Sequence, residues 1–202
     1  MNKKKLTIYI IVAAAVLIAA VKMVLMFSHQ DIDTVVARTK GASDAKVKVI
    51  EFIDFQCPAC AHGAKFLHEY MAGHQGIELQ VKYFPLVRTH SHAMQAAVYS
   101  ECAARQNKFW EFHGLLMSQQ AQWSPLINAE TIFGNIAREA GLDAARLSEC
   151  VKSDAAAQVV KDDQSLGQSL GVQSTPTYFV NNKMAVGVKS LMDELDIYFP
   201  KK

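Results

Sequence analysis

The chain contains the run Lys46-Val-Lys-Val-Ile-Glu-Phe-Ile-Asp-Phe-Gln-Cys-Pro-Ala-Cys60, in which a segment typical of a strand leads directly into two cysteines. Residues 46–55 are rich in β-branched and aromatic side chains, which predicts a strand buried on both faces, as in a central parallel sheet. From Cys57 to about Gly73 the pattern is helical, and residues 77–87 are typical of a second strand. The sequence therefore predicts a β-α-β unit with a Cys-x-x-Cys motif at the start of its helix.

The rest of the chain has a helical part followed by a second strand part. Apolar residues recur at three- and four-residue spacing through most of 90–170. Helices are predicted at 93–105, 108–119, 129–140 and 143–151. Strands are predicted at 177–180 and 184–188, joined by a turn at Asn181-Asn182, and a last helix from Ser190 to near Tyr198. The predicted α/β domain spans 45–202 in the order β-α-β, an all-helical insertion at about 89–170, then β-β-α.

The amino-acid composition limits the classes of protein to which the chain can belong. The 202 residues carry a formal net charge of +2, half are hydrophobic and 20% are charged, so one ordinary globular core is expected. This balance gives no support to a nucleic-acid partner. Ten glycines, five prolines and no visible period exclude collagen-like and repeat architectures.

The N-terminal segment differs from the domain. Three lysines at positions 3–5 precede an apolar run from Leu6 to Phe27, which is long enough to cross a bilayer. Lys22, near its end, can snorkel to the far interface. The positive N-terminal flank favours a cytoplasmic N-terminus, so residues 1–27 are predicted to be a transmembrane signal anchor and residues 28–44 a tether.

A cleaved signal peptide is the alternative interpretation of the same segment. Its small-x-small cleavage site is poorly represented, because Ala13 to Ala15 lie early in the apolar run and cleavage after Ala20 would place Ile18 at the third position before the cut. Both interpretations export the domain, to the periplasm or another extracytoplasmic face, either anchored in the membrane or secreted.

The Cys-x-x-Cys motif carries the chemistry. Cysteines at i and i+3 lie on one face of the first helical turn, close enough for a disulfide, and free backbone N–H groups there favour a thiolate. Pro58 suits the first helical position because it has no N–H to satisfy. Cys57 is therefore the predicted nucleophile and Cys60 the resolving thiol. Pro58 and Ala59, between them, are expected to contact substrate.

Other readings of the motif are weaker. A c-type haem site needs His directly after the second cysteine, but Ala61 stands there and His62 follows one place late. A zinc site needs a second pair of ligands at short spacing, which neither Cys102 nor Cys150 has. A purely structural disulfide in so small a loop would stabilise little. No metal and no organic cofactor is predicted.

Ser174-Thr-Pro-Thr177 precedes a predicted strand, where Pro176 belongs to an edge or a special turn and a cis bond is a candidate. Together with this element, three stretches resemble exported DsbA-like thiol-disulfide oxidoreductases of the thioredoxin superfamily. They are Gly41 to Cys60, Tyr83-Phe-Pro-Leu86 with His90, and Gln106-Asn-Lys-Phe-Trp-Glu-Phe-His113. With Gly171 to Val180, the resemblance covers about residues 41–200. It implies a thioredoxin fold, a cis Pro176 packed against the motif, and a Thr175 backbone that pairs with substrate.

The resemblance also suggests a role for Glu51. Family members often have a buried acid there that exchanges protons with the second thiol, and Lys82 on the neighbouring strand is a candidate charge partner. A solvent-facing Glu51 is the alternative. For His90 and His92 surface or capping roles are expected, and for His113 packing in the helical block.

Cys102 and Cys150 fall in separate predicted helices. An exported protein can keep a disulfide there, and some members of the resembling family have one at matching places. We expect this bond, with two free buried thiols as the alternative.

These observations predict an extracytoplasmic enzyme, a protein dithiol-disulfide oxidoreductase that introduces disulfides into exported proteins through Cys57 and Cys60. Its expected partners are exported substrates with cysteine thiols, the membrane, and, as the family implies, a membrane redox protein that reoxidises the pair. A disulfide reductase or isomerase is the nearest alternative, and a non-catalytic thioredoxin-like binding module is the alternative from another class.

Overall fold

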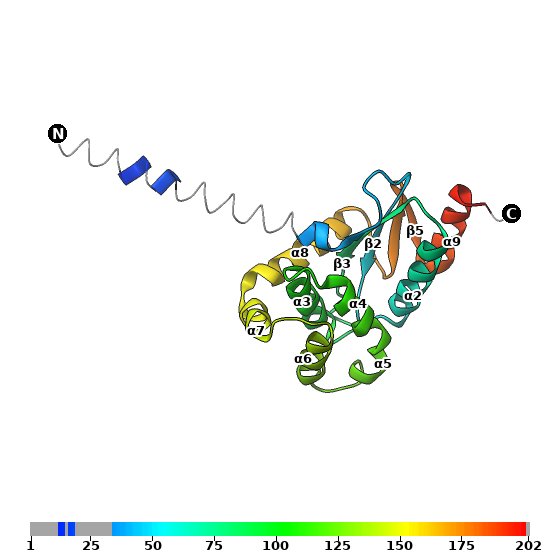
Figure 1. The fold of residues 1–202 in the computed structure, drawn as a ribbon. Helices are drawn as coiled ribbons and strands as arrows, with labels where there is room; N and C mark the ends of the chain where they lie inside the picture. The colour runs from blue at the N-terminus through cyan, green and yellow to red at the C-terminus, as the bar shows by residue number, and fades with distance from the viewer. Residues whose placement is uncertain (1–11, 15, 19–33, 201–202) are drawn as a thin grey trace.

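The structure, a computed structural model, describes residues 12–14, 16–18 and 34–200. Its centre is a mixed sheet with strand order β1-β3-β2-β4-β5 (Figure 1). The strands are β1 (Thr39–Lys40), β2 (Val47–Ile53), β3 (Ile77–Tyr83), β4 (Thr177–Val180) and β5 (Lys183–Val186). β2 and β3 run parallel, and the other neighbours run antiparallel. The predicted mixed sheet is confirmed, and β2, the strand that leads into the cysteines, lies at its middle.

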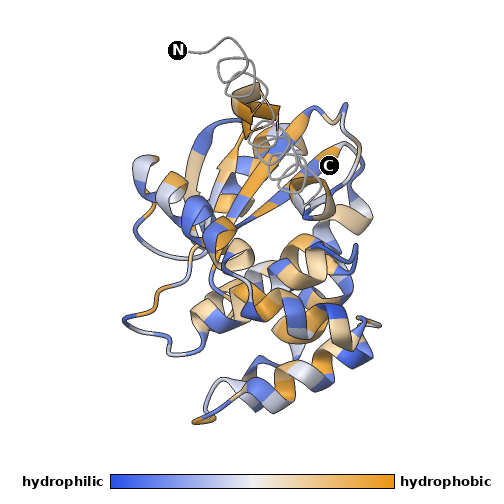
Figure 2. Cartoon of the chain, turned by 90° about the vertical axis from the view of Figure 1, so that its left-hand side faces the viewer, coloured by the Kyte–Doolittle hydropathy of each residue, from blue (hydrophilic) through white to orange (hydrophobic). Residues whose placement is uncertain are grey.

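Helices cover both faces of the sheet. α2 (Pro58–Gly73) and α9 (Gly187–Tyr198) share a core with one face. α8 (Asp154–Ser169) covers the other face so closely that a Cβ at Gly167 would lie 2.7 Å from the Phe84 ring. In Figure 2 the helices carry mixed colours, and the strands also contain both hydrophobic and hydrophilic positions. Mixed colours are expected for helices that bury one stripe against the sheet. In β3, buried residues alternate with partly buried ones.

The segment between β3 and β4 is helical. Its elements before α8 are α3 (Ala93–Ala104), α4 (Phe109–Ser118), α5 (Gln120–Trp123), α6 (Glu130–Glu139) and α7 (Ala144–Lys152). They surround a core of buried apolar residues that includes Trp123 and Phe133. This core continues into the sheet through Ile53 and Phe55, so the helical block supports the end of β2 that carries the motif.

Some boundaries differ from the sequence-based ones. β3 ends at Tyr83, four residues before the predicted end at Val87, because Pro85 has no N–H to donate to a sheet. α9 begins at Gly187 instead of Ser190, and Gly187 makes the sharp turn out of β5 with a φ of 76°.

The domain also begins earlier than predicted. β1 pairs antiparallel with β3 within the segment predicted to be a tether. Arg38, just before it, is 1% exposed and forms ion pairs with Glu101 and Asp163. A buried arginine needs such partners, which fixes residues 38–40 to the body of the domain.

The predicted transmembrane helix, residues 6–27, falls largely outside the described residues. Within residues 12–14, 16–18 and 34–200 there is no helix with the length and apolar character needed to cross a membrane.

Candidate active site

The two motif cysteines occupy the start of α2. Cys57 is the N-cap residue and Pro58 follows at the first helical position, while the Cys57 carbonyl accepts the first helical bond from Cys60 N at 3.0 Å. Cys57 is 8% exposed and Cys60 is fully buried. Because only one sulfur lies near the surface, Cys57 is the one that a protein substrate could reach.

The loop before β4 closes the site from the other side. The Thr175–Pro176 peptide bond is cis, and the Thr175 carbonyl oxygen lies 3.4 Å from Cys57 Sγ, where it accepts a hydrogen bond from the protonated thiol. Residues 57 and 175, more than a hundred positions apart, are thereby side by side. The three residues predicted to contact substrate, Thr175, Pro58 and Ala59, therefore lie next to Cys57.

The environments of the two sulfurs push their pKa values apart. The Cys60 thiol donates toward Cys57 and lowers the pKa of Cys57 to about 5, against the opposing effect of burial. Backbone N–H groups of Cys60 and Ala59 act in the same direction. Burial raises the pKa of Cys60 well above its usual range. The reduced pair therefore holds a thiolate at Cys57 and a thiol at Cys60 at neutral pH.

Glu51 lies on β2 under α2 and is 1% exposed, so the solvent-facing alternative is wrong. Burial raises the pKa of its carboxyl group to about 8, with a smaller opposing effect from Tyr178. Among the residues described, neither Glu51 Oε1 nor the Tyr178 hydroxyl has a hydrogen-bond partner of regular geometry. Glu51 is mostly protonated at neutral pH, and its charge, when present, raises the pKa of Cys60.

Lys82 is not the partner of Glu51. In the β2–β3 register Lys82 pairs with Phe52, the neighbour of Glu51, so the two side chains project to opposite faces of the sheet. Lys82 Nζ instead contacts Asp163 Oδ1 on α8 at 2.8 Å. The sequence shows that the two strands are neighbours, but a register error of one residue exchanges the faces.

Asp54 is a site residue that the sequence interpretation missed. Its buried carboxylate accepts hydrogen bonds from Gln56 N and Leu86 N at 2.7 and 2.8 Å and contacts His90 Nδ1 at 2.8 Å. Its own N–H donates to Cys60 Sγ at 3.5 Å. Asp54 therefore shapes the loop before the motif, and His90, expected at the surface, belongs to this network.

Two glutamines attach the helical block to the same loop. Gln120 Nε2 donates to the carbonyls of Phe55 and Cys57 at 2.7 and 3.0 Å. Gln56 donates to Ser124 O at 3.0 Å and accepts from His92 N at 2.7 Å. Asp54 follows a strand directly, which is a sequence signal for a turn residue, whereas nothing in the sequence distinguishes Gln120 from Gln119 or Gln122.

The other two cysteines lie apart from the motif. Cys102 on α3 is bonded to Cys150 on α7, at a sequence separation of 48. His113 packs against Phe55, Phe109 and Trp110. In the part of the chain that the structure describes, no group of three or more His, Cys, Asp or Glu side chains is arranged to hold a metal ion.

Comparison with known proteins identifies the family to which this chain belongs. Residues 33–194 match the family model described as thioredoxin. A curated relative, described as Na(+)/H(+) antiporter NhaA 3 of Salinispora tropica, is 31% identical over 144 residues, which are 71% of this chain. The chain spans only 21% of that relative, so the antiporter's own activity is not carried over.

Solved structures agree with the family match. A thioredoxin-like oxidoreductase from Silicibacter pomeroyi is 25% identical, with a TM-score of 0.66 and coverage of 81% of this chain and 92% of that one. The alpha-DsbA1 protein of Wolbachia pipientis is 19% identical, with a TM-score of 0.68 and coverage of 79% and 87%. These matches confirm the fold that the sequence resemblance implied.

Proposed function

Because the chain belongs to the thioredoxin family and has the fold of a DsbA-like member, we propose that this thiol-disulfide oxidoreductase introduces disulfides into exported proteins. One observation carries the proposal, the contrast between Cys57, which is acidic and 8% exposed, and the fully buried Cys60, whose pKa is raised. A thiolate stabilised in the reduced enzyme makes the enzyme's disulfide a stronger oxidant.

The proposed reaction has two exchange steps. A substrate thiolate attacks Cys57 in the Cys57–Cys60 disulfide, the bond between the two enzyme sulfurs breaks, and a mixed disulfide forms. Cys60 leaves as a thiolate and takes up a proton, and we assign the supply of this proton to Glu51, whose raised pKa leaves it mostly protonated. The second substrate thiolate then attacks the substrate sulfur of the mixed disulfide and displaces Cys57 as a thiolate. Two electrons pass from the substrate to the enzyme pair.

The residues around Cys57 suit a protein substrate. The Thr175 carbonyl lies within 3.4 Å of Cys57 Sγ, and Pro176 follows it in the cis form. An extended substrate segment beside Thr175 could pair with its backbone while its cysteine faces Cys57. We assign Thr175, Pro58 and Ala59 to substrate contact, and Pro176 and Glu51 to the support of the reaction.

The direction of electron flow is tested by the reduction potential of the pair, measured on the full chain in glutathione buffers. A potential above about −200 mV, together with oxidation of a reduced dithiol peptide by the disulfide form, supports the oxidase. A potential near that of thioredoxin, about −270 mV, contradicts it and supports the reductase alternative.

We place the domain outside the cytoplasm, anchored through residues 1–27, because three lysines precede the apolar run. A membrane redox protein would then reoxidise the pair. Intact-mass analysis of the exported protein tests the anchor: a full-length chain in the membrane fraction supports it. Loss of about 20 N-terminal residues contradicts it and indicates a cleaved signal peptide.

A further inference from the structure

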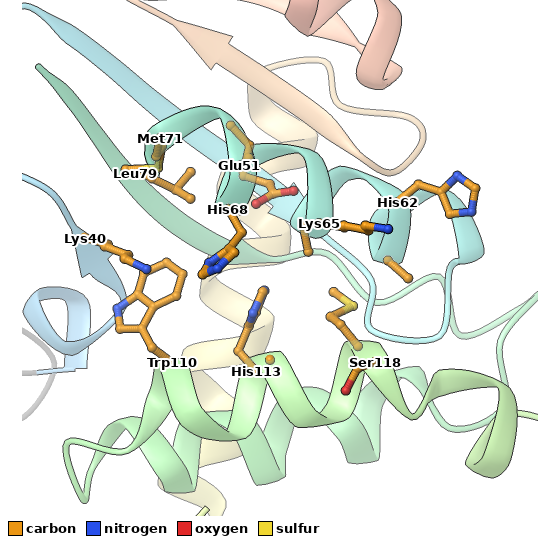
Figure 3. A pocket seen from close by; sticks show the side chains of 15 residues that line it. Lys40, Glu51, His62, Lys65, His68, Met71, Leu79, Trp110, His113 and Ser118 are labelled. Carbon is orange, nitrogen blue, oxygen red and sulfur yellow. The ribbon is translucent and has the colours of Figure 1, made fainter. Parts of the chain in front are cut away.

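A cavity of about 510 Å³ lies between α2 and α4, over the face of the sheet that holds Glu51 (Figure 3). Its apolar walls include Leu67, Met71, Leu79, Trp110 and Met117. This volume is within the range of small-molecule sites, which is about 300 to 1,000 Å³. The lining residues, all from the described part of the chain, include neither motif cysteine, and Glu51 is the residue that the cavity shares with the proposed exchange reaction.

Three buried polar atoms of the lining residues are unsatisfied. Within residues 34–200 and the two short described N-terminal pieces, Glu51 Oε1, Trp110 Nε1 and His113 Nε2 have no hydrogen-bond partner of regular geometry. Glu51 and His113 are 1% and 7% exposed. In Figure 3 His113 points up from α4 into the space below α2. A buried polar group without a partner costs about 1–3 kcal/mol, so an occupant that offers hydrogen bonds is favoured here.

The fixed charges at the cavity are positive. Lys40 and Lys65 contribute ammonium groups, and Lys40 Nζ lies 5.6 Å from the centre of the Trp110 ring. Glu51 is the single acidic residue of the described lining, and burial raises its pKa to about 8, which leaves it mostly neutral at pH 7. Burial lowers the pKa of His113 to about 4, so His113 is neutral as well.

Apolar walls, positive charge and unsatisfied donors together specify a ligand. We propose that the cavity binds an amphipathic organic anion, whose apolar body lies between α2 and α4 and whose acidic group is attracted by the positive charges of Lys40 and Lys65 at the two ends of the cavity (Figure 3). Trp110 Nε1 donates to an acceptor atom of this ligand. Water alone would satisfy the polar atoms but would leave the aliphatic walls wet, which disfavours it as the occupant.

The test uses the full chain in zwitterionic lipid nanodiscs and two probes with the same apolar body. 8-Anilinonaphthalene-1-sulfonate carries an anionic group, and N-phenyl-1-naphthylamine does not. The chain has two tryptophans, so its indole N–H signals in a ¹⁵N NMR spectrum are simple to assign. Trp123 is the internal control, because its Nε1 already donates to Leu116 O at 2.8 Å.

We expect the anionic probe to shift the Trp110 indole signal with one-site saturation, to leave that of Trp123 in place, and to bind about tenfold more tightly than the neutral probe. Equal affinity of the two probes would overturn the assignment of an anion. A titration that moves neither indole signal would overturn the proposal that the probe binds in this cavity. The same result is expected if another part of the chain already fills the cavity, which would also contradict the proposal.

A matched pair of glycine variants tests the location. Gly114 lines the cavity on α4, and a Cβ there would meet no atom of the described residues within 4 Å. Gly134 on α6 is equally open to a Cβ and lies outside the lining. Both positions are helical, so leucine suits the backbone of each. Gly114→Leu should weaken the anionic probe about tenfold or more, and Gly134→Leu should not. Equal effects would contradict the proposal.

A second matched set tests the charge. Lys40→Gln and Lys65→Gln should reduce the preference for the anionic probe severalfold while the neutral probe binds as before. Lys161→Gln on α8 removes the same charge from an exposed position outside the cavity and should change neither. A preference that persists in the double variant Lys40→Gln/Lys65→Gln would overturn the role of the lysines.

Discussion

The two cysteine pairs of this chain share one chemistry and differ in almost every physical respect. Cys57 and Cys60 are three positions apart on one helical turn, whereas Cys102 and Cys150 join two helices across 48 residues. The first pair lies among groups that change the charge of its sulfurs, including Glu51 and backbone N–H groups. The second holds α3 to α7.

This difference indicates that loop length and local charge determine which pair is structural and which is redox-active. In the chain-entropy treatment a long closed loop contributes more stability than a short one, so the distant pair suits a structural role. A short loop at a helix N-terminus contributes little stability but can hold a thiolate. Four sets of substitutions test this division.

The largest effect is expected at Cys57. Cys57→Ala should lower oxidase activity about 1,000-fold or more, because the attacking and leaving sulfur is lost. Cys60→Ala should instead accumulate mixed disulfides with substrates, visible as reductant-sensitive bands in non-reducing gels. If the Cys57→Ala variant traps substrates through Cys60, the roles of the two cysteines are reversed.

Removal of the distant pair should affect stability instead of activity. The double variant Cys102→Ala/Cys150→Ala should lose about 4 kcal/mol of unfolding free energy, measured in urea, while exchange at Cys57 continues. In the unmodified protein, mild reductant should expose Cys57 and Cys60 to alkylation before Cys102 and Cys150. Alkylation of all four cysteines in exported, non-reduced protein would contradict the structural role.

Glu51 should make stability depend on pH. Its pKa is about 8 in the folded protein against an ordinary 4.5, so the folded state retains a proton that the unfolded state releases between these values. Stability should therefore fall as pH rises from 5 to 8.

Glu51→Gln should remove on the order of 3 kcal/mol of this fall, because each pKa unit corresponds to about 1.36 kcal/mol. Urea unfolding of the oxidised protein at pH 5 and 8 measures it without titration of Cys57. Asp44→Asn, at an exposed position, is the matched control. A Glu51→Gln profile as steep as that of the unmodified protein would show that Glu51 is ionised throughout.

The smallest effect concerns Ala59, whose side chain brings neither charge nor a hydrogen-bond donor to Cys57. Ala59→His should lower the pKa of Cys57 by about one unit and raise the reduction potential by roughly 30 mV. Thiolate absorbance and equilibration with glutathione measure the two quantities. Ala59→Gln, long and uncharged, should change both less. An unchanged pKa in Ala59→His would show that Ala59 does not face the sulfur.

Periodicity and motif context predicted much of this architecture. The strand before Cys57, the helix after it and the helical insertion each follow from local patterns in the sequence. β1, two residues long, carries too few residues for a pattern, and the burial of Arg38 depends on Glu101 and Asp163, which lie far along the chain. The sheet face of Lys82 depends on register, which local sequence does not determine. The hydrogen bonds of Gln120 to Phe55 and Cys57 join residues far apart in the sequence, so a local pattern does not predict them either.

The amide group of Gln120 limits how this protein could be simplified by design. It donates to the Phe55 and Cys57 carbonyls from the helical block. An engineer who excised the insertion to obtain a minimal redox scaffold would remove those donors along with it. The trimmed scaffold would then need another amide donor at the same place. Without it, the loop before the motif would lose two hydrogen bonds that hold it in the full-length protein.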